Sequence, residues 1–221
     1  RALTRLPNLP SRGLGRARPL RPDELPLIRV ASLHALNRQT PRNRASAAHY
    51  AFAECGAMSA ETPQITGEDL DNLRKPTVVS VPGTQVNAAR DLSIDGFASR
   101  LVEGFLDLSY RGHDARTSLT YRGGHAADSH AVSADASSLF RRSLLLNAGL
   151  TDVDLTPQSI SYARAYMLES SGDRDTAAQV MGVSADRVPE LLCLITDADA
   201  RMDALQNDDE THDYKFRGDA A

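Results

Sequence analysis

Three histidines and an aspartate in the polar stretch 111–138 have the types and spacing of metal ligands. His125, Asp128 and His130 lie close together in the sequence, and His113 precedes them. Imidazole nitrogens and carboxylate oxygens are ligands that zinc takes in proteins. Loop histidines are far more often solvated surface residues, and no cysteine or second cluster accompanies these four. We therefore predict that the protein binds no metal, and we expect no cofactor.

The two cysteines, Cys55 and Cys193, lack the spacing of metal ligands and lie in apolar helical contexts. This pattern is typical of reduced thiols in a cytosolic protein. The sequence has no run of eighteen apolar residues and no recognisable signal peptide, so we expect no membrane-spanning segment. A chain of 221 residues with ordinary composition suffices for one large or two small globular domains.

The arginines are concentrated near the N-terminus. Residues 1–44 contain ten arginines and two acidic residues, a net charge of +8, whereas residues 45–195 carry −7 and residues 196–221 carry −5. We interpret residues 1–20 as a basic arm or linker and residues 196–221 as an acidic C-terminal tail. An arginine-rich arm is suited to clamping nucleic-acid phosphates, and a solvated lead-in segment fits the same composition.

Residues 155–194 predict a helix, a tight turn and a second helical unit. Thr156 and Pro157 are typical of a helix start, and apolar or small residues then recur on one face. A further helix over 176–181 is expected to end at Gly182, because glycine adopts the left-handed conformation without steric penalty. Residues 174–192 also fit a helix-turn-helix, although Pro189 would shorten the second helix.

The remaining elements follow from hydrophobic periodicity and turn residues. Two short β-branched or apolar stretches around a Pro-Gly turn predict a hairpin. The expected order is a helix with an apolar face over 27–36, a helix over 45–60, strands over 78–81 and 91–94, a helix over 97–108, a polar loop over 111–138 and a helix over 139–146. The sequence therefore predicts a mostly α-helical fold with a small antiparallel β-sheet.

Two stretches resemble the catalytic domain of tyrosine recombinases, the phage-type integrases. The first is Gly56-Ala57-Met58-Ser59-Ala60-Glu61, where the family reads G-L-R-x-x-E. The second begins at Gln158-Ser159-Ile160-Ser161, where the family reads H-x-L-R, and continues through two helices to Gly182-Val183-Ser184, where it reads G-H-S. The resemblance implies an integrase-like, DNA breaking-rejoining fold over residues 21–195.

The resemblance also implies that the catalytic residues are replaced. Family members attack a DNA phosphodiester with a tyrosine, and arginines, histidines and a lysine stabilise charge and transfer the proton. The corresponding positions here are Met58 and Ser161 for the two arginines, Thr84 for the lysine on the hairpin, Gln158 and Val183 for the histidines, and Leu192 for the tyrosine. Such a protein would be a catalytically inactive pseudo-recombinase.

The function implied by this resemblance is binding of double-stranded DNA in a regulatory, architectural or recombination-accessory role. The candidate phosphate contacts are Arg141, Arg142, Arg164 and Arg187. A second copy of the chain or an active recombinase is a possible partner, and we expect a cytoplasmic protein, associated with the nucleoid if it binds DNA.

Two alternatives remain open on the sequence alone. The first is a protein-interaction module that no longer binds DNA, which the charge of −7 over residues 45–195 favours because an acidic surface repels phosphates. The second is an active recombinase with a rearranged site, in which Tyr214 would be the displaced nucleophile.

Overall fold

The computed structural model describes residues 18–38, 40–112, 114–120, 130–152 and 154–192. Its elements, in chain order, are α1 (Leu25–Asn37), α2 (Pro41–Cys55), the short turns η1 (Thr62–Gln64) and η2 (Gly67–Asp69), β1 (Val78–Val81), β2 (Arg90–Ser93), α3 (Gly96–Phe105), η3 (Leu106–Tyr110), α4 (His130–Asn147), α5 (Pro157–Ser170), α6 (Arg174–Met181) and α7 (Arg187–Leu192). The fold is mostly helical, as the sequence predicts.

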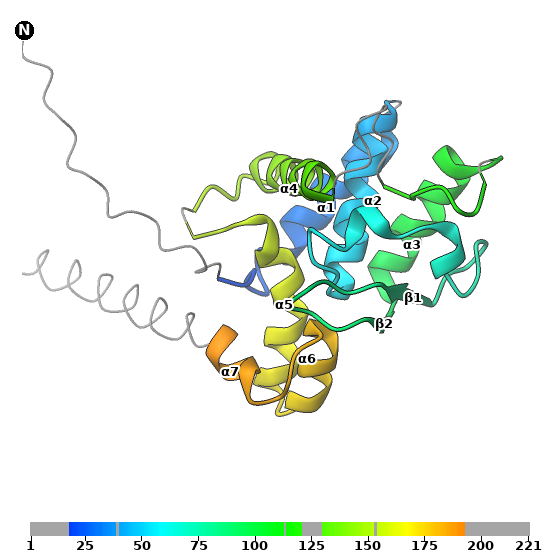
Figure 1. The fold of residues 1–221 in the computed structure, drawn as a ribbon. Helices are drawn as coiled ribbons and strands as arrows, with labels where there is room; N and C mark the ends of the chain where they lie inside the picture. Colours follow the sequence, from blue (N-terminus) through cyan, green and yellow to red (C-terminus); the bar gives the residue numbers. More distant parts are fainter. Residues whose placement is uncertain (1–17, 39, 113, 121–129, 153, 193–221) are drawn as a thin grey trace, which may run out of the picture.

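Helix α2 is the centre of the main core. All seven residues from 47 to 53 are completely buried, including His49, Tyr50 and Phe52. A helix that is buried on all sides needs neighbours on all sides, and α2 packs against α1, α3, α4 and α5. The second half of α5 carries a separate apolar cluster with α6 and α7, and Figure 1 shows these two helices packed at its lower end.

The small sheet is an antiparallel hairpin of β1 and β2, the strands present among the described residues. Val78 pairs with Ser93 and Val81 pairs with Arg90. Val79, Val81 and Leu92 are buried, and their side chains belong to the main core. Because side chains alternate along a strand, the opposite face carries polar residues that face solvent. The hairpin therefore lies on the core with its connecting loop free to reach α6.

Helix caps fix where α5 and α6 begin and end. The Thr156 hydroxyl accepts a hydrogen bond from the Gln158 N–H at 3.3 Å, and the Asp173 carboxylate accepts one from the Thr176 N–H at 3.2 Å. Gly182 follows α6 with φ of 67°, in the left-handed region that favours glycine. These predicted boundaries are confirmed to within two residues.

Two predicted boundaries are wrong. The helix expected over 45–60 ends at Cys55, because Gly56 turns the chain with φ of 112°. The polar loop expected over 111–138 is too long, since α4 begins at His130. Serine, alanine and aspartate in the first turns of α4 gave no apolar periodicity from which to predict a helix.

The structure describes only the last three residues of the predicted basic arm, 18–20. Residues 1–17 lie outside the described residues, as does the predicted acidic tail 196–221. Arg18 and Leu20 are buried, and the Arg18 guanidinium binds Glu24 at 2.6 Å and Asp152 at 2.5 Å. The folded core therefore starts by Arg18. Within the part of the chain that the structure describes, no helix has the length and apolar character needed to cross a bilayer.

Gly56 offers a direct test of how α2 meets α6. A Cβ at Gly56 would lie 2.5 Å from Val180 Cγ1, in addition to the strain of a left-handed residue. We expect Gly56→Ala to lower the free energy of unfolding by roughly 2–4 kcal/mol, the sum of backbone strain and overpacking. Urea denaturation followed by circular dichroism measures this loss.

Gly172→Ala is the matched control for this substitution. Gly172 also has a positive φ, 87°, but a Cβ there meets no atom within 4 Å. Only the backbone strain of about 1–2 kcal/mol should appear. Equal losses in the two variants would show that the contact between Gly56 and Val180 does not limit stability.

Candidate functional site

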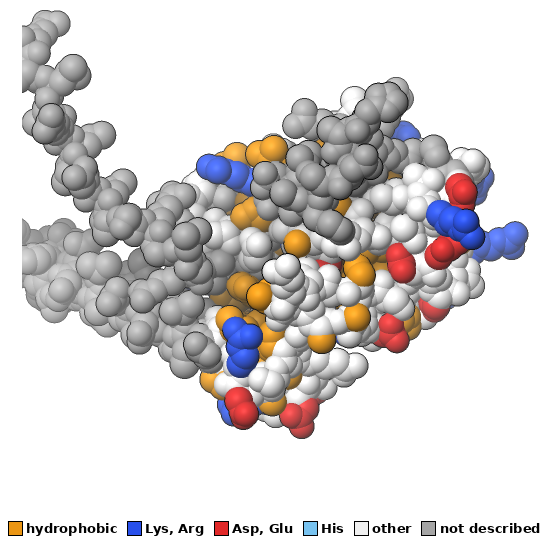
Figure 2. Space-filling model, viewed as in Figure 1, with side chains coloured by type: hydrophobic (Ala, Val, Ile, Leu, Met, Phe, Trp, Pro, Cys, Tyr) orange, Lys and Arg blue, Asp and Glu red, His pale blue; other side chains and the backbone are white. Residues whose placement is uncertain are grey.

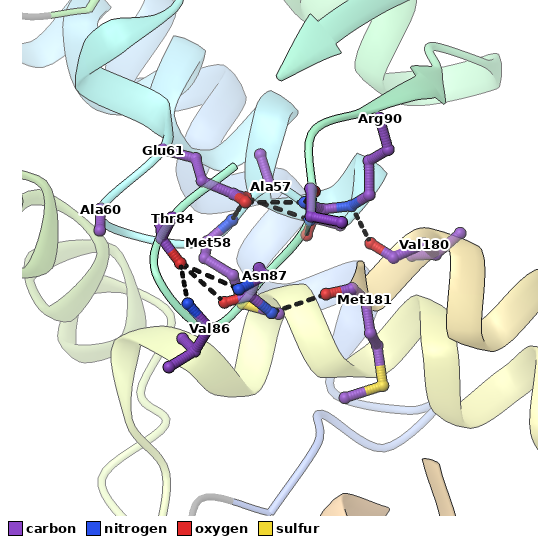
Figure 3. Close-up of polar contacts among 12 residues, drawn as sticks. Ala57, Met58, Ala60, Glu61, Thr84, Val86, Asn87, Arg90, Val180 and Met181 are labelled. Carbon is purple, nitrogen blue, oxygen red and sulfur yellow. Dashed lines mark hydrogen bonds and ion pairs between the residues drawn. The ribbon is translucent and has the colours of Figure 1, made fainter. Parts of the chain in front are cut away.

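A cleft of about 740 Å³ lies between the α2–η1 turn, the hairpin loop, α5 and the start of α7. Four of the six positions singled out by the integrase resemblance line it: Met58, Thr84, Gln158 and Val183. They come from four separate segments of the chain, and Figure 3 shows Met58 and Thr84 near one another. Ser161 and Leu192 do not line the cleft.

Ser161 lies beneath the cleft in a buried polar cluster. Its hydroxyl donates to the Ala57 carbonyl at 2.7 Å and accepts from Arg141 Nη1 at 2.9 Å. Arg141 Nη2 also donates to the Ala57 carbonyl at 3.0 Å and to the Thr62 hydroxyl. Leu192 is buried in the apolar cluster of α5, α6 and α7.

The expectation that Arg141 contacts DNA is wrong for this structure. Arg141 is 0% exposed, and its guanidinium is occupied by protein acceptors, so no phosphate can reach it. Burial lowers the pKa of Arg141 to about 9, and the nearby Glu61 carboxylate acts in the opposite direction. The side chain is therefore a charged structural element at neutral pH, located directly below Met58 and Ser161.

Glu61 and Arg90 form a buried ion pair that joins the walls of the cleft. The exposed fractions of their side chains are 0% and 5%. Arg90 Nη1 lies 2.7 Å from Glu61 Oε1, and Glu61 Oε2 accepts the Met58 N–H at 2.7 Å. The same guanidinium donates through Nε to the Val180 carbonyl at 2.8 Å and through Nη2 to the Gly56 carbonyl at 3.3 Å (Figure 3).

The hairpin loop caps the C-terminus of α6. Besides the bond from Arg90, the Asn87 side-chain amide donates to the Met181 carbonyl at 2.7 Å, and the Ala88 N–H donates to the Gly182 carbonyl at 2.8 Å. Helix C-termini leave carbonyls without helical partners, and the loop supplies donors to three consecutive ones. Thr84 holds the loop tip, because its hydroxyl accepts the N–H groups of Val86 and Asn87 (Figure 3).

The other three predicted phosphate contacts differ in availability. Arg187 is exposed, lines the cleft, and has no ion-pair partner among the described residues. Arg142 is exposed on α4. Arg164 is 22% exposed and binds the Asp95 carboxylate at 3.1 Å, which offsets its charge. Arg187 is the one cationic side chain in the lining of this cleft.

Among the residues that the structure describes, the lining contains no acidic side chain. In Figure 2, acidic side chains lie toward one end of the molecule and along the lower edge, whereas the middle of this face carries apolar and uncharged polar side chains. An anion entering the cleft would meet Arg187 at its edge and no carboxylate. Like-charge repulsion therefore does not close the cleft to a phosphate backbone passing over it.

The hydroxyls that line the cleft belong to Tyr162 and Thr84. Burial raises the pKa of Tyr162, which keeps its phenol protonated at neutral pH. Among the described residues, no histidine, lysine or carboxylate lines the cleft to accept a proton from either hydroxyl. Activation of a hydroxyl nucleophile requires such a base or a lowered pKa.

Several sequence-based candidates lie outside the described residues. These include Tyr214, Cys193, and His113, His125 and Asp128 of the predicted metal cluster, while the side chain of His130 is not described. Across the described ranges, no group of three histidine, cysteine or acidic residues is arranged to hold a metal ion. Cys55 is a free, buried thiol, and burial raises its pKa to about 12.

Sequence reasoning missed Arg90 and misplaced Arg141. Arg90 starts the second strand of the hairpin, and its charge gave no sign that it faces inward. The carboxamides of the cleft, Gln64, Gln85 and Asn87, were also missed. The only signal for Gln85 and Asn87 is the density of uncharged polar residues in 82–89, which is ordinary for a loop, and Gln64 lies outside that stretch.

The fold is similar to that in the crystal structure of XerA recombinase. The match has a TM-score of 0.61 at 17% sequence identity, and it covers 85% of this chain and 64% of the recombinase chain. This chain therefore spans less than two thirds of that protein. No family model matches the sequence, and no curated protein matches it. At this identity the likeness shows a recombinase-like fold, mostly helical with a two-stranded antiparallel sheet.

Removal of one partner of the Glu61–Arg90 pair is expected to destabilise the protein strongly. Arg90→Met would leave the buried Glu61 carboxylate without its hydrogen-bonded partner, with Arg141 as the nearby positive charge, and would remove the donor to Val180. Breaking a buried pair in this way costs about 3–5 kcal/mol. Urea denaturation of Arg90→Met, Glu61→Met and the double variant measures the cost and the coupling, and we expect the double variant to lose less than the sum of the two.

Arg116→Met is the control. Arg116 pairs with Glu68 at the surface, where the side chains are 80% and 57% exposed, and solvent screening leaves such pairs with little effect. If Arg90→Met cost no more than Arg116→Met, the buried pair would not be what holds the cleft together.

Proposed function

We propose that this protein binds double-stranded DNA without cleaving it, on the face that contains the cleft. The main support for the proposal is that four positions of the integrase pattern line one cleft. Among the described residues, that lining contains one cationic side chain, Arg187, and no acidic side chain. The recombinase-like fold supports the same proposal. We infer that the protein lacks catalysis because Met58, Thr84, Gln158 and Val183 stand at positions where the integrase family has catalytic residues.

The replaced residues would remove catalysis in two ways. Methionine, glutamine and valine cannot neutralise the charge that develops on the phosphoryl group in the transition state. Each lost donor reduces the rate about 100-fold or more. Arg141, the cation nearest to Ser161, is buried and makes its bonds to protein acceptors instead. Binding energy from the surrounding surface would remain, and this fits a regulatory, architectural or accessory role for a cytoplasmic, nucleoid-associated protein.

A second candidate function is protein interaction through the same cleft. The observation in its favour is that Met58 and Met181 line the cleft, because thioether side chains adapt to varied apolar partners. Under this hypothesis the partner would be a second copy of the chain or an active recombinase, and DNA would not bind. Salt-dependent DNA binding separates the two hypotheses.

The DNA-binding proposal predicts a salt-sensitive complex in which Arg187 takes part. In a fluorescence anisotropy titration with labelled duplex DNA, we expect Arg187→Gln to bind severalfold more weakly than the wild type. The slope of log affinity against log salt should fall by about 0.9 for one lost phosphate contact. The titration is run at low and at moderate salt.

Arg111→Gln is the matched control for Arg187→Gln. Arg111 is 79% exposed, pairs with Asp107 on η3, and does not line the cleft. Its loss should leave the affinity unchanged. A wild-type protein that shows no salt-sensitive binding to duplex DNA would refute the proposal.

The absence of cleavage is tested separately with a nicked suicide substrate, which traps a covalent protein–DNA adduct. We expect no adduct from the wild-type protein on a denaturing gel, because the cleft offers no base and no cluster of cations to activate a hydroxyl. An adduct would contradict this expectation. Tyr162→Phe and Tyr214→Phe would then show which tyrosine had attacked the phosphodiester.

A further inference from the structure

The cleft is lined largely by uncharged side chains of two kinds. Its apolar part consists of Met58, Met181, Val183 and Leu191, with the ring of Tyr162 beside them. Met58 and Met181 are 7% and 1% exposed, so each is held in place by its surroundings. Thioethers and aromatic rings make favourable contacts with the faces of flat rings. The volume of about 740 Å³ is within the range of small-molecule sites.

The second kind of side chain is the carboxamide. Gln64 and Asn87 have their amide donors engaged, by the Ala60 carbonyl at 2.8 Å and by the Met181 carbonyl at 2.7 Å. Gln85 and Gln158 make no side-chain hydrogen bond with the described residues, so each presents a donor and an acceptor to the cleft. A ligand that matches them must itself offer a donor next to an acceptor.

A phosphate uses only half of each free carboxamide. Its oxygens accept hydrogen bonds from the amide N–H groups but offer the carbonyl oxygen no donor. The edge of a nucleobase offers both functions, and asparagine and glutamine pair with the N6 and N7 positions of adenine in this way. The polar lining of the cleft therefore matches a base better than it matches the backbone of the nucleic acid.

Arg187 is the one charged side chain among the described residues of the lining, so it can bind the phosphate attached to such a base. A base that leaves a duplex carries its own phosphate, which stays at the mouth of any pocket that accepts the ring. We propose that the cleft binds a single unpaired base of DNA, with Gln158 on its edge and Arg187 on the adjoining phosphate. This inference rests on the proposed function, because it assumes that DNA lies over the cleft.

The test compares three labelled duplexes that differ at one position: fully paired, with one unpaired adenine, and with an abasic residue in place of that adenine. An unpaired base needs little energy to enter a pocket, and stacking on protein side chains is worth about tenfold in affinity. We expect the unpaired adenine to bind about tenfold more tightly than either of the other duplexes, measured by anisotropy at one salt concentration.

Gln158→Met is the decisive variant, because it keeps the size of the side chain and removes both hydrogen-bonding groups. It should bind the paired duplex as the wild type does and lose the preference for the unpaired adenine. Gln179→Met is the matched control, since Gln179 is exposed on α6 and does not line this cleft. It should keep the preference.

The outcomes separate this inference from the proposed function. Equal affinity for all three duplexes, with salt-sensitive binding, would overturn the inference and leave the proposed function in place. An equal gain in affinity for the abasic duplex would also overturn the inference, because the protein would then be recognising the distorted backbone and not the base. No binding to any duplex would refute both, whereas binding of the unpaired-adenine duplex alone would support the cleft and refute general duplex binding.

Discussion

The buried ion pair between Glu61 and Arg90 is the interaction on which the cleft depends. A guanidinium and a carboxylate that are 5% and 0% exposed lose most of their hydration, and only close, multiple hydrogen bonds compensate for that loss. Glu61 receives bonds from Arg90 and from the Met58 N–H, and Arg90 makes three more to the main-chain carbonyls of Val180, Ala88 and Gly56. One pair thus fixes the end of α2, the start of β2 and the end of α6 relative to one another.

The same arrangement explains how the cleft keeps its shape. The Gly56 and Val180 carbonyls and the buried Arg90 side chain that bonds to them lie behind its surface, whereas Asn87, which bonds to the Met181 carbonyl, is part of the lining. The residues at the surface, such as Gln158 and Val183, contribute little to that framework. Substitutions at the surface of the cleft therefore leave its geometry intact, which is consistent with the shared fold at 17% identity.

The helices and strands could be predicted from short stretches of sequence. The burial of charged side chains by distant parts of the chain could not. Gly182 and the caps at Thr156 and Asp173 act within one turn of chain, so their effect is readable from neighbouring residues. Arg141 and Arg142 are adjacent in the sequence, yet the first is buried and the second exposed, because one residue of helix rotates the side chain by about 100°. Only the packing of α4 against η1 and α5 decides which of the two faces inward.

The cluster around Arg141 also limits which side chains position 161 can accept. The Ala57 carbonyl accepts from both Ser161 and Arg141, so the space beneath the cleft is already filled by a guanidinium. An arginine at position 161 would bring a second positive charge against the first, in a region where burial already lowers the pKa of Arg141 to about 9. Serine at 161 and arginine at 141 are therefore a matched pair. Placing a second cation at position 161 would therefore require the removal of the one at position 141.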